Sequence, residues 1–290
     1  MPPHSYSFQR YLASKKTVDD RALNAHVWQT LACHLPAHAP RVLEVGAGIG
    51  TMAERLAERR TLTRAHYTVL DEQAENIAVA RERLAACSPF TLDFQIAEAV
   101  EFCARPEQSG QYDVLIAHAF LDLLDLRSAV PALLAALKPG GVFYFTLNFD
   151  GGTFFQPEIE RALDDQIEAL YHRTMDERLT NNLPSGDSRS GRHLFGVLRE
   201  CRAEILAAGS SDWTVFAQPD GRYPADEAYF LHFIIHTLHG ALCHHPELNH
   251  AHFENWITQR HAHIERGDLV YIAHQMDFVG KTFLGADKHG

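Results

Sequence analysis

Two kinds of segment follow one another along the chain: short apolar runs, and longer stretches whose apolar residues recur at helical spacing. The apolar runs predict buried strands, and they cover residues 42–45, 66–70, 90–96, 112–117, 142–147 and 213–217. Stretches at helical spacing lie between them at residues 52–60, 72–87 and 128–137. Strands that alternate with helices predict an α/β fold with a doubly wound, mostly parallel sheet.

The remaining segments are expected to complete this sheet and to add helices outside it. Helices are predicted over residues 5–35, 159–179 and 192–208, a polar loop over 181–191, and two more helices within 219–267. Residues 269–279 are extended and are predicted to form the seventh and last strand, antiparallel and at the edge of the sheet.

Three parts of the chain follow from this order of elements. We expect an N-terminal helical cap over residues 1–40, a Rossmann-like ligand-binding core over 41–150, and the rest of the same domain over 151–290. Two insertions, at about 153–191 and 219–267, leave from the side of the sheet where the strands end. Open α/β sheets bind ligands on that side, so the insertions are predicted to form a helical lid.

Composition restricts the classes of partner and compartment. The chain has 290 residues, 46% of them hydrophobic, and a formal net charge of −11, so nucleic acid and anionic membranes are poor partners. Five cysteines without a C-x-x-C pattern indicate reduced thiols. No segment has the apolar length of a signal peptide or a membrane span, and we expect a cytoplasmic protein, monomeric or homodimeric.

The predicted first strand leads into a glycine-rich turn with the order Glu44-Val-Gly46-Ala47-Gly48-Ile-Gly50. Glycines leave room for a ligand to approach the backbone closely. Asp71 ends the second predicted strand, and an acid at that place can accept hydrogen bonds from both ribose hydroxyls of an adenosine. The pattern predicts an adenosyl-binding site.

The order Glu-x-Gly-x-Gly-x-Gly followed by an acid resembles the class I, Rossmann-like methyltransferases that depend on S-adenosylmethionine (SAM). Leu-Lys-Pro-Gly-Gly at residues 137–141, before an apolar fifth strand, is a second point of resemblance, and it is also a physical helix stop. The resemblance covers residues 41–150 by motif and the rest by element order only. It implies SAM as cofactor, S-adenosylhomocysteine (SAH) as product, and a small-molecule acceptor methylated on oxygen or nitrogen.

The resemblance also implies roles for individual residues. The cofactor-binding residues would include Gly46, Gly48 and Gly50 at the methionine part, Asp71 at the ribose, Glu98 at the adenine, Arg21 at the carboxylate and His118 near the methyl group. The others would be Glu44, Ala47, Glu72, Ala99 and Ala119. Glu98 stands where the family commonly has aspartate, and it could instead be a helix N-terminal acid. Arg21, with Tyr11 and Lys16, could instead lie on a solvated helix face.

His118 is the candidate catalytic base, because a neutral imidazole is available near pH 7. The alternative is a loop residue whose backbone contacts the cofactor. Asp122, Asn148 and Asp150 follow the same two strands, and lid aromatics would suit an apolar acceptor.

Other functions remain open at this point. A nicotinamide-dependent oxidoreductase would have G-x-G-x-x-G, but position 51 is Thr51. A SAM- or SAH-binding sensor or scaffold without transferase activity would share the whole motif, as would an enzyme of decarboxylation or aminopropyl transfer. His232, His236 and His239 share one helix face, yet no carboxylate is clearly placed beside them, and we expect no metal.

Overall fold

The computed structural model describes residues 2–85, 89–180 and 182–283, and within them the centre is an eight-stranded sheet. Its strands are β1 (Arg41–Val45), β2 (His66–Asp71), β3 (Thr91–Ile96), β4 (Tyr112–His118), β5 (Leu137–Gln156), β8 (Glu204–Ser210), β9 (Trp213–Val215) and β10 (Val270–Lys281). The order is β3-β2-β1-β4-β5-β10-β8, with β9 also paired to β10. The first five strands are parallel and β10 is antiparallel, which confirms the predicted fold class.

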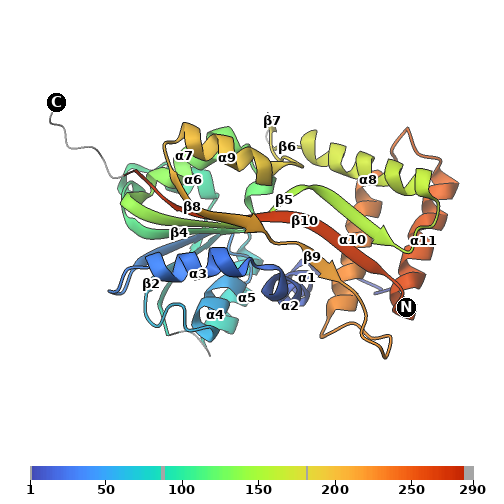
Figure 1. Cartoon of the computed structure of the whole chain (residues 1–290), viewed down its shortest axis with the longest axis horizontal. Coiled ribbons are helices and arrows are strands. Elements are labelled where there is room, and N and C mark those ends of the chain that lie inside the picture. The colour runs from blue at the N-terminus through green and yellow to red at the C-terminus, as the bar shows by residue number, and fades with distance from the viewer. Residues whose placement is uncertain (1, 86–88, 181, 284–290) are drawn as a thin grey trace.

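Helices cover both faces of the sheet (Figure 1). One face carries α3 (Ala25–His34), α4 (Thr51–Glu58) and α5 (Ala74–Ala85), and the other carries α6 (Ala99–Cys103), α7 (Leu126–Ala135) and α9 (Ser190–Glu200). Successive residues of a strand point to opposite faces. Val42 therefore joins one apolar cluster and Leu43 the other. The predicted end of the α5 helix at Cys87 lies outside the described residues.

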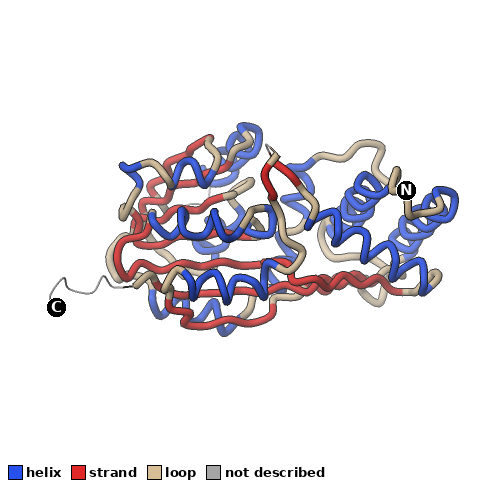
Figure 2. The backbone as a smooth tube through the Cα atoms, turned by 90° about the horizontal axis from the view of Figure 1, so that it is seen from above, coloured by secondary structure: helices blue, strands red, loops and turns tan. Residues whose placement is uncertain are grey.

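Strand β5 is much longer than predicted. It includes residues 137–141, which were expected to stop a helix, and it continues past Leu147 to Gln156. β10 pairs with it from Lys281, opposite Val142, to Val270, opposite Gln156. The two strands run out of the sheet toward the helices α8 (Arg161–Asp176), α10 (Glu227–Leu242) and α11 (His250–Arg266), as Figures 1 and 2 show. We call these three helices and their connections the lid.

The sheet differs from prediction beside β10. The helix expected over 192–208 ends at Glu200, because Arg202 has a positive φ of 54°, and Glu204–Ser210 is the strand β8. The expected sixth strand is β9, an additional strand beside the outer part of β10. β10 itself lies between β5 and β8, so β8 rather than β10 is at the edge.

The segment predicted as one helix over 5–35 forms three, α1 (Phe8–Ser14), α2 (Lys16–Ala22) and α3. Leu23 and Asn24 are extended between the last two, and the Asn24 side chain accepts from the amides of His26 and Val27 to begin α3. The predicted polar loop over 181–191 has a short hairpin at its start, of β6 (Leu179–Thr180) and β7 (Leu183–Pro184). Within the described residues, no helix is long and apolar enough to cross a membrane.

Candidate functional site

A first cavity, which we call the glycine-loop cavity, opens where β1, β2 and β4 end. It holds about 670 Å³ of space, counted with the part open to solvent. Its lining comes from the loop after β1, from the ends of β2 and β4, and from the N-terminal helices: Gly46, Ala47, Gly48, Ile49, Thr51, Asp71, Glu72, Gln73, Asn76, His118, Ala119, Phe120, Leu123, Phe8, Leu12 and Lys15.

The glycines of the loop serve two different purposes. Gly46 and Gly48 have φ of +60° and +55°, and their missing Cβ atoms would lie 2.2 Å from the Phe120 ring and 3.2 Å from Leu12. Both glycines line the cavity. A Cβ on Gly50 would instead lie 2.8 Å from Leu84 of α5, so Gly50 allows the close packing of α5 and does not line the cavity.

Asp71 lies at the cavity wall and holds the loop. Its Oδ2 accepts a hydrogen bond from the Gly48 amide at 2.8 Å, and its Oδ1 accepts from the Gln73 amide at 2.9 Å and from Asn76 Nδ2 at 3.1 Å. A carboxylate offers about four acceptor positions. Asp71 therefore keeps acceptor capacity for a bound molecule.

Two other predicted acids lie away from the cavity. Glu44 is buried below the loop, where the Tyr67 hydroxyl donates to it at 2.7 Å, and burial raises the pKa of Glu44 to about 7. Glu98 begins α6 by accepting from the amides of Val100 and Glu101, the alternative that the sequence left open. Neither acid lines the glycine-loop cavity, nor does Ala99, which is buried in α6.

Arg21 also lies elsewhere. Its guanidinium donates two hydrogen bonds to Glu227 of α10, at 2.6 and 2.8 Å, and it does not line the cavity. The role of Arg21 at the cofactor carboxylate stays a prediction, and in this structure Glu227 occupies the guanidinium fork that would bind that carboxylate. Lys15, between α1 and α2, is the cation that lines the cavity, and sequence reasoning missed it.

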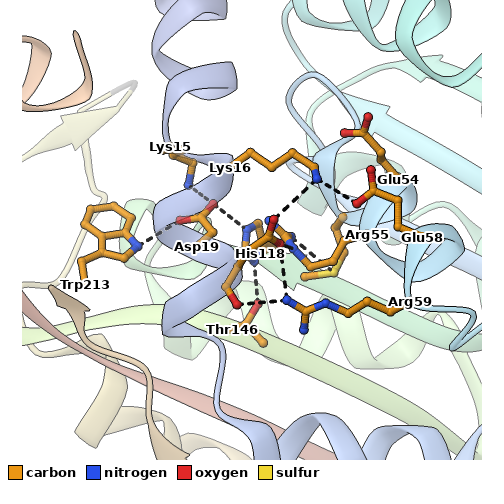
Figure 3. A network of polar contacts seen from close by, with 12 residues as sticks. Lys15, Lys16, Asp19, Glu54, Arg55, Glu58, Arg59, His118, Thr146 and Trp213 are labelled. Carbon is orange, nitrogen blue, oxygen red and sulfur yellow. Dashed lines mark hydrogen bonds and ion pairs between the residues drawn. The ribbon is translucent and has the colours of Figure 1, made fainter. Parts of the chain in front are cut away.

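His118 belongs to a buried network at the end of β4 (Figure 3). Its Nε2 lies 3.1 Å from Oδ2 of Asp19 and its Nδ1 lies 2.8 Å from the Thr146 hydroxyl, while Trp213 donates to the other oxygen of Asp19. A carboxylate only accepts, so Nε2 carries the proton and Nδ1 accepts from Thr146. Burial lowers the pKa of His118 to about 4. Both nitrogens are occupied, and this geometry does not favour His118 as a base.

Lys15 links this network to the cavity. Its ammonium lies 3.2 Å from Oδ2 of Asp19, and both side chains are almost fully buried. The positive charges of Lys15 and of neighbouring groups hold the pKa of Asp19 well below its usual range, against the effect of burial.

A second cavity, which we call the lid cavity, lies between the N-terminal helices, the strands β5 and β10, and the lid. It holds about 1070 Å³, counted in the same way. Four of the aromatic residues expected in the lid line it, namely Phe149, Tyr171, Trp213 and Phe233. The two cavities share the wall residues Phe8, Leu12, Lys15, Ala119 and Leu123, so they are neighbours.

The other polar candidates have partners within the protein. Asn148 donates to the carbonyl of Met276, and Asp150 accepts from Arg192. His232 is bound to Glu265 and His261, and His239 is bound to Glu254. Within the described ranges, no group of three or more histidine, cysteine or acidic side chains has the geometry of a metal site.

Residues 43–143 match a family model for a methyltransferase domain. The chain is similar to the malonyl-[acyl-carrier protein] O-methyltransferase of Geobacter sulfurreducens, with 27% identity over 77% of this chain and 73% of the relative. It is also similar to the ubiquinone biosynthesis O-methyltransferase of Marinobacter nauticus, with 33% identity over 39% of this chain and 47% of the relative. The second match therefore spans less than half of that relative's length.

A solved structure has the same fold. BH2331 of Bacillus halodurans C-125, itself only provisionally assigned as a methyltransferase, matches with a TM-score of 0.52 and 11% identity, over 89% of this chain and 100% of that one. At this identity the likeness shows the fold alone.

Proposed function

Because this chain belongs to the class I SAM-dependent methyltransferases, we propose that it methylates a small molecule, bound in the lid cavity, on oxygen or nitrogen. The observation that carries the proposal is the shared wall between the glycine-loop cavity and the lid cavity. Methyl transfer needs donor and acceptor in contact and away from water, and neighbouring cavities provide both. The relatives' names favour oxygen, since both are O-methyltransferases.

The residues of the glycine-loop cavity fit SAM. Gly46 and Gly48 line the cavity without side chains, so the methionine part can approach their backbone. Asp71 can accept from a ribose hydroxyl at its remaining acceptor position, and the Lys15 ammonium can bind the methionine carboxylate. SAM supplies a methyl group already activated by a positively charged sulfur, so the protein's task is to bind, orient and exclude water.

A sensor that binds SAM without transferring its methyl group would not need the lid cavity. The apolar wall beside Ala119 and Leu123 therefore supports transfer over binding alone. The nicotinamide alternative has no support from the family match.

Calorimetry with SAH tests the proposal directly. The full chain should bind SAH, and Asp71→Asn should weaken binding about tenfold or more, equivalent to about 1.4 kcal/mol, because the amide cannot accept at both positions. Asp93→Asn, on the exposed side of β3, is the matched control and should bind as the unmodified chain does. Absence of heat with SAH in a folded sample would contradict the proposal.

A further inference from the structure

Two side-chain oxygens at the lid cavity are buried without a hydrogen-bond partner among the described residues. Asp122 lies in the short helix η2 (Leu121–Leu123) that follows β4, and its Oδ1 is buried without a hydrogen bond. Gln275 of β10 is 2% exposed, and its Oε1 is buried without a hydrogen bond as well. Both line the lid cavity. Buried polar atoms are normally satisfied, so a bound molecule with hydrogen-bond donors would complete this cavity.

Asp122 lies where the two cavities meet. Ala119 and Leu123, on either side of it in the chain, are residues of the shared wall. Among the acids that the structure describes, Asp71 lines only the glycine-loop cavity, and Asp122 is the one that lines the lid cavity. A proton acceptor for a molecule in the lid cavity is therefore available at Asp122, whereas both nitrogens of His118 are already bound.

The charges around Asp122 restrict the acceptor group. Arg178 lines the same cavity, and its guanidinium forms no hydrogen bond or ion pair with another described residue. A protonated amine would lie beside Arg178, and a carboxylate would lie beside Asp122, so each meets a like charge. A neutral hydroxyl is repelled by neither Asp122 nor Arg178. As its proton leaves, the positive charges of Arg178 and Lys15 stabilise the negative charge that develops on its oxygen.

The cavity walls restrict the rest of the molecule. Phe149, Tyr171 and Phe233 line it with aromatic side chains, and Leu12 and Met175 add aliphatic ones, so the wall suits an apolar ring. A carboxylate is a weak base, and it removes a proton more readily from an aromatic hydroxyl, with a pKa of about 10, than from a hydroxyl as weakly acidic as water, at about 15.7. The acceptor hydroxyl is therefore expected on the ring itself.

From these contacts we propose that the acceptor is an aromatic molecule with a free ring hydroxyl, and that Asp122 takes the proton of that hydroxyl. The inference rests on the proposed function. The O–H bond breaks and its proton goes to the Asp122 carboxylate, while an oxygen lone pair forms the bond to the methyl carbon. The electrons of the carbon–sulfur bond stay on sulfur. The product is an aryl methyl ether, and Asp122 then returns its proton to solvent.

Binding tests the proposal without turnover. The full chain, saturated with SAH, is titrated in a calorimeter with phenol, benzoate and benzylamine, which share a ring and differ in the polar group. We expect phenol to bind about tenfold tighter than the other two. Preference for benzoate or benzylamine, or no heat with phenol, overturns the inference. The first titration, with SAH alone, tests the proposed function separately, since its failure would leave no saturated protein to titrate.

Turnover tests the role of Asp122. In Asp122→Asn, kcat with a phenol should fall about 100-fold or more while KM stays within about threefold, and Asp122→Glu should recover part of the rate. Asp165→Asn, exposed on α8, is the matched control and should keep full activity. Thermal unfolding of each variant checks that it is folded. A kcat within about threefold of the unmodified chain in a folded Asp122→Asn excludes Asp122 as the proton acceptor.

The pH profile is a further readout. Burial raises the pKa of Asp122, repulsion from Asp187 adds to this, and Arg178 and Lys15 act in the opposite direction. The rate should fall at low pH as the carboxylate takes up a proton, and this decline should be absent from the residual rate of Asp122→Asn. An unchanged decline in the variant would assign the titrating group elsewhere.

Discussion

The imidazole of His118 binds the carboxylate of Asp19 through Nε2, at 3.1 Å, and so joins the end of β4 to helix α2. Lys15 and Trp213 bind the same carboxylate. The buried carboxylate of Asp19 therefore binds three side chains beside the wall that the two cavities share.

The first prediction concerns pH and His118. Its folded pKa of about 4 is below the ordinary 6.5, so between these values the unfolded chain binds a proton that the folded chain does not. The free energy of unfolding should fall as pH is lowered through this window, by about 3 kcal/mol in total from this residue. In urea unfolding measured at a series of pH values, the free energy of unfolding of His118→Asn should change less with pH than that of the unmodified chain. His26→Asn, on the exposed side of α3, is the control and should keep the pH dependence of the unmodified chain. If all three proteins have the same pH dependence of unfolding, the effect does not come from His118.

Glu44 should have the opposite pH dependence. Its folded pKa of about 7 is above the ordinary 4.5, so the folded chain keeps a proton that the unfolded chain loses as pH rises between these values. Stability from this group is full below the lower value and declines as pH rises, by up to about 3 kcal/mol. Glu44→Gln should remove the decline, because an amide does not titrate and its oxygen can still accept from Tyr67. Glu75→Gln, exposed on α5, is the control and should lose stability with rising pH as the unmodified chain does. The same loss of stability in Glu44→Gln would contradict the expectation.

Lys15 should select for the carboxylate of the cofactor. Lys15→Met should weaken SAH binding about 10- to 100-fold, the range of a charge-assisted hydrogen bond. Binding of 5′-methylthioadenosine, which lacks the amino-acid part, should change less than about threefold, and this comparison separates the contact from general damage to the Asp19 network. Lys16→Met, which removes a surface ion pair with Glu58, is the matched control. If Lys15→Met weakens the binding of SAH and of 5′-methylthioadenosine equally, the SAH carboxylate does not bind Lys15.

Gly46 and Phe120 should be coupled. A Cβ at Gly46 would lie 2.2 Å from the Phe120 ring, and the φ of +60° adds the cost of a left-handed residue. Gly46→Ala should destabilise the protein by more than the roughly 1–2 kcal/mol of the backbone alone, and Phe120→Ala in the same chain should recover the excess. Gly110→Ala measures the backbone cost by itself, because Gly110 has a φ of +65° and open space around it. Additive costs in the double variant would refute the coupling.

The sequence predicted those helices, strands and turns that are determined by residues close together in the chain. The strand, glycine turn and helix at residues 41–58 and the strand that ends at Asp71 were predicted because neighbouring residues suffice to place each of them. The length of β5 was missed because its outer half is stabilised by pairing with β10, more than a hundred residues later. β8 was taken as helix because Ala207 and Ala208 have a high helical propensity, which edge pairing with β10 overrides.

In the candidate site too, contacts between residues far apart in the chain could not be predicted from the sequence. Arg21 was a reasonable partner for a carboxylate, but the one it binds is Glu227, 206 positions away. Lys15 was overlooked because the break between α1 and α2, which turns it toward the cavity, has no clear sequence signal. Asp122 was noticed only as one acid among several, since its lack of a partner is a property of packing.

The continuous pairing of β5 with β10 has a consequence for how molecules reach the space beneath the lid. A cover joined by loops can swing, but here rotation would break main-chain hydrogen bonds along both strands. The helices α1 and α2 are instead attached by side chains, among them the half-exposed ion pair of Arg10 with Asp226 and the pair of half-exposed Arg21 with buried Glu227. Loosening these two helices would cost side-chain contacts and no hydrogen bonds of the sheet, and salt would weaken the exposed ion pair among those contacts.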